Sequence, residues 1–544
     1  ILDVTLEELY SNGYRIHTVM DRELQSTAEQ LCADLNNFPP AAPDGTFAQV
    51  AVVAMDPRTG AVSTLVGGRE YETALGFNRA TQMRRQPGSI IKPFVSFSPA
   101  LEELNMNAVT FLNDEPTDFN GYKPRNFGDS YNGRVTLRTA LANSLNVPAV
   151  YLLNEAGVNV GFSYAQRAGL PLVEADRGLA TALGGITQGV TPLEICNAYA
   201  GFANMGQRMQ GYTIERIEHA DGTVIYEHEP ESTYFLSAET AFMMNDLLYY
   251  TADRGTAAIF NTVGTRLAGK TGTVDYMDIG NKDAWATGYN PEIVMTAWMG
   301  IDTPAPDRYM STQVVGGRQP ANLIARILTE YYIDRESPDW YTMPVGLTAV
   351  DIDMQTTEIL GRPIVATANT PAAYRQTTYF RIGSVPTETT TFWDTPRAPA
   401  DVAVSEDAEG VPIVTFTMPS TYVFYQLYRQ VDDGAAVLLA TVDGSQGKAA
   451  IRDVEAPHAM PSKYYVTPVH KYARPDGSKN VGLPSRPVIH VRSQSQIIIP
   501  VLPDDWAPNT PGLPPPSEDE FEDMEPGNDV PRTQIGDDLG GQNQ

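Results

Sequence analysis

Cysteine and histidine are scarce in this chain of 544 residues, and their scarcity excludes several kinds of site. Two cysteines, Cys32 and Cys196, cannot build a disulfide scaffold or a multi-cysteine zinc site, and we expect both to be free, buried thiols. Only six histidines occur, and no two lie at the i, i+4 spacing of a helical zinc motif. We therefore expect no metal site and no cofactor.

Long hydrophobic runs and an excess of basic charge are also missing. No apolar run reaches the roughly 18 to 20 residues of a membrane-spanning helix, and no signal-peptide pattern is present. The chain has 38 basic and 66 acidic side chains, a formal net charge of −28. Residues 503–544 account for −10 of it, leaving −18 for the first 502 residues. This charge is a poor match for nucleic acid or an anionic membrane, so we expect these residues to bind neither.

The first residue is Ile1, so we expect the chain to be a fragment or processed form of a longer protein. Its length predicts about three or four domains. The order of the predicted elements indicates one α+β domain: short apolar strands at 50–55 and 61–66, then helices, then a strand-rich block at 263–301. The helices are predicted at 23–35, 91–106, 136–145, 147–156, 191–204, 237–250 and 321–332.

Composition changes along the chain divide it into five segments. After the α+β domain come a Thr- and Pro-rich stretch and then short β-like runs separated by Asp-Gly turns, which is the pattern of an all-β sandwich. The last residues are rich in proline and acidic side chains, which predicts disorder. The predicted segments are a linker (1–40), the α+β domain (41–335), a β-rich connector (336–397), the sandwich (398–495) and a disordered tail (496–544).

The first candidate site lies in residues 85–94 (RQPGSIIKPF), where Ser89 stands at a predicted helix start and Lys92 follows one turn later. A serine hydroxyl needs a neighbouring base to become a nucleophile. A lysine can be that base when burial and nearby cations lower its pKa. The helix start also offers backbone N–H groups to an oxyanion. Ser89 and Lys92 are therefore the candidate nucleophile and base.

The second candidate is Ser144-Leu145-Asn146, between two predicted helices. The hydroxyl of Ser144 could relay a proton to a leaving amine, and the amide of Asn146 could hold a substrate peptide bond. Both short motifs recur in the chain, in surroundings rich in Gly and Asp that indicate turns and loops. These copies, interpreted as coincidences, are Ser445–Lys448, Ser130–Asn132 and Ser478–Asn480.

The third candidate is residues 269–273 (GKTGT), which contain the only Lys-Thr-Gly of the chain. On a strand, its lysine and threonines would face a substrate carboxylate, and the backbone N–H of Thr273 could complete an oxyanion site. Residues 264–271 also match a phosphate-binding loop, but the β-like residues after the lysine disfavour the helix that such a loop requires. The candidate substrate-binding residues are Asn146, Lys270, Thr271, Gly272 and Thr273.

These three motifs, in this order within one domain, resemble the transpeptidase domain of class A penicillin-binding proteins. The likeness extends over about 13–335 and includes the linker that precedes this domain in the family. Residues 398–494 resemble the fibronectin type III-like module that some members carry. Further segments similar to the family are 18–25, 122–126 (YKPRN), 135–138 (VTLR), 182–185 (ALGG), 190–194 (VTPLE), 283–285 (DAW) and 288–289.

The resemblance implies an α+β, β-lactamase-like serine transpeptidase fold and a D,D-transpeptidase that cross-links peptidoglycan. Ser89 would attack the penultimate D-Ala of a stem peptide ending in D-Ala-D-Ala, with Lys92 as base and Ser144 as proton shuttle. An amine of a neighbouring stem would resolve the acyl-enzyme. The partners implied are both stem peptides and β-lactam antibiotics, at the extracytoplasmic face of a bacterial membrane. The family also implies a glycosyltransferase domain and a membrane anchor in the parent protein.

Two kinds of alternative remain open at the level of sequence. A D,D-carboxypeptidase or a β-lactamase-like hydrolase uses the same short motifs, although the lactamase Glu has no clear equivalent here. The segment Glu155–Asn159 is the nearest match, and we expect Gly157 to end a helix there. A non-catalytic wall-binding protein is the other alternative, but such a protein has no need of Ser89 and Lys92 together.

Overall fold

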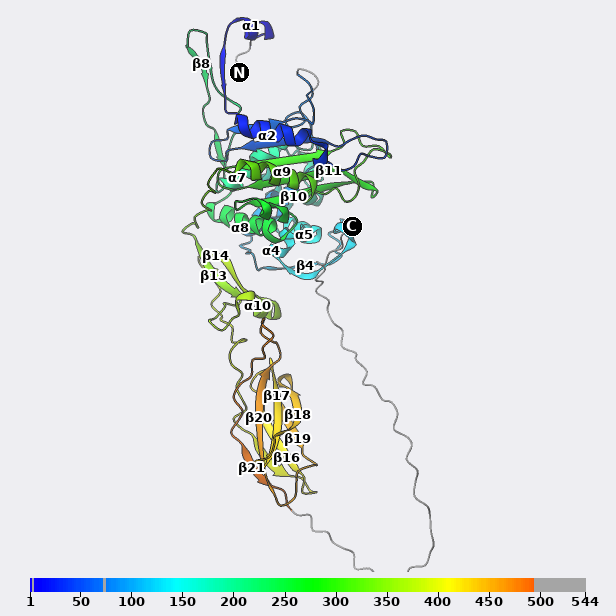
Figure 1. The fold of residues 1–544 in the computed structure, drawn as a ribbon, viewed down its shortest axis with the longest axis vertical. Coiled ribbons are helices and arrows are strands. Elements are labelled where there is room, and N and C mark those ends of the chain that lie inside the picture. Colours follow the sequence, from blue (N-terminus) through cyan, green and yellow to red (C-terminus); the bar gives the residue numbers. More distant parts are fainter. Residues whose placement is uncertain (2–3, 72–74, 494–544) are drawn as a thin grey trace, which may run out of the picture.

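The computed structural model describes residues 1, 4–71 and 75–493 (Figure 1). The predicted disordered tail, 496–544, lies outside the described residues. Figure 1 shows a mixed α/β body, then a small two-stranded unit, and then a separate group of strands. No helix in the described ranges combines the length and the apolar character needed to cross a membrane.

A five-stranded antiparallel sheet forms the centre of the α/β body, with the strand order β10-β11-β12-β2-β3. The hairpin predicted around residues 56–60 is confirmed, because β2 pairs with β3 across this turn. Strand β2 also pairs with β12, which joins the start of the body to its end. The strands are β2 (Gln49–Met55), β3 (Val62–Val66), β10 (Ala268–Tyr276), β11 (Gly280–Tyr289) and β12 (Val294–Gly300).

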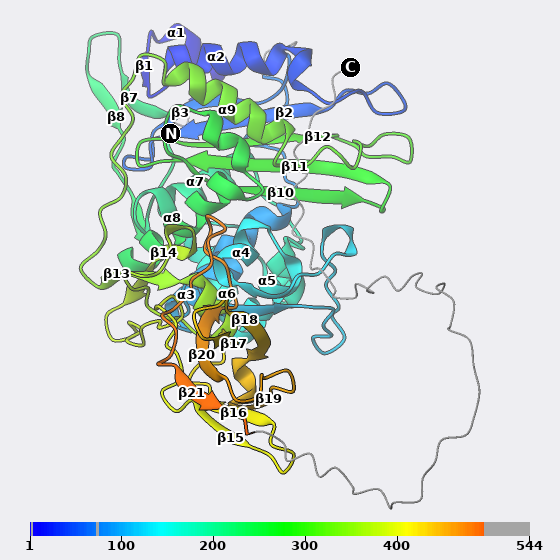
Figure 2. The same cartoon turned by 60° about the horizontal axis from the view of Figure 1, so that its bottom comes forward.

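Helices cover both faces of this sheet (Figure 2). Alternate residues of β2 point to opposite faces, as the period of a strand requires. Val50 and Val52 pack with α2 and α9, whereas Ala51 and Val53 belong to a larger core with α7 and α8. The sheet is therefore buried on both sides. These helices are α2 (Arg22–Ala33), α7 (Pro192–Ala203), α8 (Ala238–Arg254) and α9 (Gln319–Tyr331).

The helical stretch predicted around 91–106 is confirmed as far as residue 102, but its first turns are irregular. The chain forms a 3₁₀ turn at Gly88–Ile91, a π-helical turn at Pro93–Phe97 and only then a short α-helix. Pro93 and Pro99 each lack the N–H group that a regular helix needs, which explains the irregular pattern of backbone hydrogen bonds in this helical run. The remaining helices of this half are α3 (Ser98–Glu102), α4 (Leu137–Ala142), α5 (Asn146–Ala156) and α6 (Val158–Arg167).

Three small sheets lie around this body. One contains the linker strand β1 next to the hairpin of β7 and β8, and the others are the pairs β4-β5 and β6-β9. The first helix, α1 (Leu6–Ser11), precedes β1. The strands are β1 (Arg15–Thr18), β4 (Phe111–Asp114), β5 (Gly133–Thr136), β6 (Gln207–Met209), β7 (Ile214–Glu218), β8 (Val224–Glu227) and β9 (Ser232–Tyr234).

The segment predicted as a β-rich connector contains one antiparallel pair of strands, and between them an α-helix that was not predicted. Strands β13 (Leu347–Asp353) and β14 (Arg375–Arg381) pair with each other. Helix α10 (Met354–Leu360) begins where the Asp353 side chain accepts the N–H of Thr356, and it ends at Gly361 with φ 71°. The unit packs on the body through Tyr379, whose ring meets Phe242 edge-on at 4.9 Å.

The last strands form two sheets, in the orders β15-β16-β19 and β18-β17-β20-β21. Val414 and Phe416 of one sheet share a core with Tyr425, Leu427 and Val466 of the other, so the sheets face each other. The strands are β15 (Ala403–Glu406), β16 (Pro412–Thr417), β17 (Val423–Val431), β18 (Val437–Asp443), β19 (Lys448–Arg452), β20 (Pro461–His470) and β21 (Val488–Val491).

The two cysteines are free and buried, as predicted. Burial raises the pKa of both thiols to about 12, so neither is a reactive thiolate near neutral pH.

Candidate active site

Ser89 lies on the 3₁₀ turn that packs against β10. Two glycines allow this close approach. A Cβ added to Gly88, whose φ is 58°, would lie 2.6 Å from the carbonyl oxygen of Thr273, and one added to Gly272 would lie 2.5 Å from that of Pro87. The partly exposed Ser89 is thereby held beside the strand that carries the Lys-Thr-Gly motif.

The turn is also tied to the sheet and helices through its backbone. The indole N–H of Trp285, on β11, donates to the carbonyl of Gln86 at 3.0 Å. The hydroxyl of Tyr199, on α7, donates to the carbonyl of Ile90 at 2.7 Å. Both aromatic side chains are fully buried, so the position of Ser89 is fixed from two sides by rigid elements.

Lys92 is fully buried, and its three shortest Nζ contacts are with oxygens of residues 144–146, where the break after α4 meets the start of α5. These are the carbonyls of Ser144 (2.5 Å) and Leu145 (3.1 Å) and Oδ1 of Asn146 (2.6 Å). Burial, and next the positive charge of Lys270, hold the pKa of Lys92 well below its ordinary value. Three donated hydrogen bonds use every hydrogen of an ammonium group, so these contacts fit the protonated form of Lys92. The lowered pKa makes the loss of one proton easier, and the resulting neutral amine can accept a proton.

Lys270 lies on β10 and reaches the same segment from the other side. Its Nζ donates to Ser144 Oγ at 2.8 Å and to the carbonyl of Thr271 at 2.8 Å. Lys92 Nζ lies 3.5 Å from the same serine oxygen. Burial lowers the pKa of Lys270 to about 7. The hydroxyl of Ser144 therefore stands between two buried amines, an arrangement that can pass a proton.

Ser144 has φ 56°, in the left-handed region that few residues other than glycine adopt. It lies in the break between α4 and α5, where the sequence predicted two helices that nearly touch. Uncommon backbone conformations cluster at functional sites, because the surrounding structure must hold them in place.

Asn146 is the first residue of α5, and its side chain is bonded within the protein. Oδ1 accepts from Lys92, and Nδ2 donates to the carbonyl of Arg125 at 2.7 Å. The predicted contact of this amide with a substrate stays a prediction.

The threonines of the Lys-Thr-Gly motif differ in their surroundings. Thr271 is buried, and its hydroxyl lies 2.8 Å from that of Thr256. Thr273 is half-buried, and its Oγ1 accepts the backbone N–H of Gly316 at 3.1 Å. Thr273 is therefore the more accessible of the two.

The structure brings most of the predicted site residues together. Lys92, Ser144, Asn146 and Lys270 form one hydrogen-bonded cluster, and the turn of Ser89 lies against β10 beside it. In the part of the chain that the structure describes, no hydrogen bond joins Ser89 Oγ to Lys92 Nζ, whose bonds go to residues 144–146.

The structure also tests the other motif matches found in the sequence. Lys270 is in the middle of a strand rather than at a helix start, so the phosphate-loop alternative is wrong. The Ser445–Lys448 copy lies in a turn of the sandwich, as interpreted. Helix α5 ends at Ala156, and the following Gly157 has φ 93°, which confirms the predicted helix end.

Several residues around the site were missed from the sequence. Asn126 accepts the backbone N–H of Asn146 at 2.8 Å, and Asp114 in turn accepts from Asn126 at 2.7 Å. Thr256 and Gly316 contact the threonines of the motif. Asn126 belongs to the family-like segment 122–126, which was the one available signal. Nothing local in the sequence distinguishes the other three.

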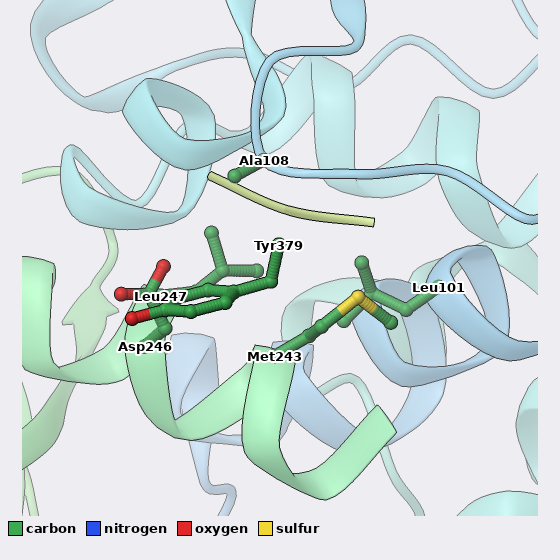
Figure 3. Close-up of a pocket in the computed structure, with 6 residues that line it drawn as sticks. All are labelled: Leu101, Ala108, Met243, Asp246, Leu247 and Tyr379. Atoms are coloured by element: carbon green, nitrogen blue, oxygen red, sulfur yellow. The ribbon is translucent and has the colours of Figure 1, made fainter. Parts of the chain in front are cut away.

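A separate small pocket lies where the helices of the body meet β14 (Figure 3). Asp246 is its one acidic lining residue, and it accepts a bond from Arg138 at 2.6 Å. Burial raises the pKa of Asp246. None of the predicted site residues is among those that line this pocket: Leu101, Ala108, Met243, Asp246, Leu247 and Tyr379.

Comparison with known proteins finds one family model that matches residues of the α/β body. The profile described as "Penicillin binding protein transpeptidase domain" matches residues 50–316. Penicillin-binding protein 1F of Bacillus subtilis is 37% identical over 328 residues, which is 60% of this chain and 44% of that protein. The chain thus spans less than half the length of the curated relatives it matches first.

Solved structures share the fold at lower identity. A crystal structure of penicillin-binding protein 1A from Haemophilus influenzae matches with a TM-score of 0.58 and 22% identity, covering 70% of this chain and 73% of that one. The PonA1 protein from Mycobacterium tuberculosis, in complex with penicillin V, matches with a TM-score of 0.54 and 24% identity, covering 63% and 92%.

Proposed function

We propose that this chain, whose residues 50–316 match the penicillin-binding protein transpeptidase domain, is a serine D,D-transpeptidase that cross-links peptidoglycan stem peptides. The observation that carries the proposal is the hydroxyl of Ser144, placed between the amines of Lys92 and Lys270 beside the turn of Ser89. One nucleophile, one base and one relay group are what acyl transfer requires.

In the first step, Ser89 Oγ attacks the carbonyl carbon of the penultimate D-Ala in a D-Ala-D-Ala stem. The neutral amine of Lys92 takes the hydroxyl proton, and an ester forms as the peptide C–N bond breaks. Ser144 passes a proton to the nitrogen of the leaving D-Ala. In the second step an amine of another stem attacks the ester, loses its proton to the same groups, and regenerates the Ser89 hydroxyl.

The substrate ends in a carboxylate, and Lys270 is the cation best placed for it. The net charge of −28 works against capture of an anion, so local positive charge has to provide the attraction. A bound carboxylate would favour the ammonium form of Lys270, against the effect of burial. Thr273 would add its hydroxyl, and the N–H groups of Ser89 and Thr273 would face the developing oxyanion.

Fluorescent penicillin labelling tests the proposal, because β-lactams mimic the D-Ala-D-Ala end and PonA1 has been solved with penicillin V. We expect rapid, persistent labelling that is lost in Ser89→Ala. The matched control is Ser445→Ala, which removes the serine of the second Ser-x-x-Lys copy and should leave labelling unchanged. Labelling that survives Ser89→Ala would contradict the assignment of the nucleophile, and rapid loss of the label would indicate a lactamase.

A second assay separates the transpeptidase from a carboxypeptidase. The protein is incubated with donor and acceptor stem peptides, and the products are separated by mass. A cross-linked dimer supports the proposal, whereas released D-Ala without dimer supports a carboxypeptidase.

The proposal for the whole protein extends further. The relatives that this chain matches first are more than twice as long as the aligned part. We therefore propose that the parent protein of this chain is a bifunctional class A penicillin-binding protein. It would be anchored in the membrane, with this chain at the extracytoplasmic face. The two facing sheets of residues 403–491 would be its fibronectin type III-like module.

A further inference from the structure

A buried carboxylate lies behind the candidate site, at the end of β4. Asp114 is fully buried. Its Oδ1 accepts from Asn126 Nδ2 at 2.7 Å, and its Oδ2 accepts from the backbone N–H of Asn132 at 2.9 Å and from Nδ2 of that residue at 2.8 Å. All the hydrogen bonds that the described residues give it come from neutral amides. Burying a carboxylate without a hydrogen-bonded cation is costly, so a compensating role is expected.

Asn126 connects this carboxylate to the start of α5. The N-cap position of that helix is Leu145, whose side chain cannot accept a hydrogen bond. Asn126 supplies the missing acceptor from another segment, because its Oδ1 accepts the backbone N–H groups of Asn146 at 2.8 Å and Val147 at 3.4 Å. The position of the first turn of α5 is therefore set by Asn126.

The first residue of that turn, Asn146, binds Lys92 through its side chain at 2.6 Å. A continuous series of hydrogen bonds thus runs from Asp114 through Asn126 and Asn146 to the amine of Lys92. We propose that Asp114 and Asn126 are positioning residues of the acylation site, which hold Asn146 and Lys92 in place and set a negative charge behind the amine. This inference rests on the proposed function of Ser89 and Lys92.

The proposed role of Asp114 can be measured through its effect on the pKa of Lys92. Burial, and next Lys270, lower the pKa of Lys92, and the charge of Asp114 acts in the opposite direction. Other acidic side chains on the surrounding elements are engaged elsewhere: Glu102 of α3 accepts from Ser237, and Asp283 of β11 pairs with Arg85. Removing the charge of Asp114 should lower the pKa of Lys92 further.

The test measures the rate of acylation by fluorescent penicillin as a function of pH. In Asp114→Asn, we expect the acidic limb of the profile to move to lower pH, because Lys92 becomes neutral at lower pH. In Asn126→Ala, we expect the rate at the optimum to fall about tenfold to a hundredfold, as the amine loses its fixed position. The matched control is Asp353→Asn, an equally buried carboxylate that caps α10, which should change neither quantity.

Rates are expressed per folded molecule, with the folded fraction measured by circular dichroism. The inference would be overturned if the pH profile of Asp114→Asn stays in place or moves to higher pH. It would also be overturned if Asn126→Ala is acylated at the wild-type rate. Unfolding of both variants would also overturn it, since the pair would then serve folding rather than positioning. If wild-type protein is not labelled at all, the proposed function fails instead, so the two failures are distinguishable.

Discussion

At the scale of single residues, Ser144 combines an uncommon backbone conformation with a hydroxyl shared between two lysines. Ser144→Ala keeps the Cβ and removes the relay, so we expect labelling by penicillin to slow about a hundredfold or more. Ser144→Gly removes the hydroxyl as well but relieves the left-handed strain. It should be as slow as Ser144→Ala yet more stable by about 1 kcal/mol. Labelling kinetics and thermal unfolding measure both effects. Equal stability of the two variants would contradict the strain, and fast labelling of either would contradict the relay.

The buried lysines also predict how stability depends on pH. Burial lowers the pKa of Lys270 to about 7 from its ordinary value of 10.5, so between these values the unfolded chain binds a proton that the folded chain does not. Unfolding therefore becomes more unfavourable as pH rises through this window. Lys270→Met removes this contribution, and we expect the rise in the unfolding midpoint with pH to become smaller. Denaturant titrations at several pH values measure this dependence of the unfolding midpoint on pH. If the dependence is the same in Lys270→Met and in the wild-type protein, the low pKa of the buried Lys270 is contradicted.

At the scale of elements, the contact between the Ser89 turn and β10 depends on glycine. Gly88→Ala would bring a Cβ to 2.6 Å from a backbone oxygen in addition to the cost of φ 58°. Gly128→Ala is the matched control, because Gly128 has φ 71° and nothing within 4 Å of the added atom. We expect Gly128→Ala to cost about 1 kcal/mol and Gly88→Ala distinctly more, with slower labelling. Equal costs and equal labelling would show that the close approach is unimportant.

The sequence predicted the elements whose signal is local. Apolar periodicity and the positions of proline and glycine were enough to predict several elements. These are the hairpin of β2 and β3, the helices α7, α8 and α9, and the end of α5 at Gly157. The irregular turns at 88–97 were missed, because Pro93 and Pro99 interrupt a pattern that otherwise reads as one helix. Asp114 and Asn126 were not assigned because their partners lie 12 to 21 residues away and depend on the folded arrangement.

At the scale of the whole molecule, aromatic side chains join the connector to the sandwich. His470 is buried against Phe392, with ring centroids 4.6 Å apart, and burial lowers its pKa from 6.5. Below about pH 6.5 the unfolded chain gains a proton that the folded chain resists, so the sandwich should lose stability as the pH falls. We expect His470→Gln to weaken this acid sensitivity and to leave penicillin labelling unchanged. Unfolding followed by tryptophan fluorescence in both proteins measures the acid sensitivity, and an equal sensitivity would contradict the role of His470.

The motifs Ser-x-x-Lys, Ser-x-Asn and Lys-Thr-Gly are separated by more than 50 residues each, yet the structure gathers them beside the edge strand β10. The most direct test of the central claim is to map the adduct formed when the intact protein reacts with penicillin. Mass spectrometry of the digested protein should place one acyl group on the peptide that contains Ser89, and none in Ser89→Ala. An adduct on any other residue, or no adduct in the folded wild-type protein, would contradict the assignment.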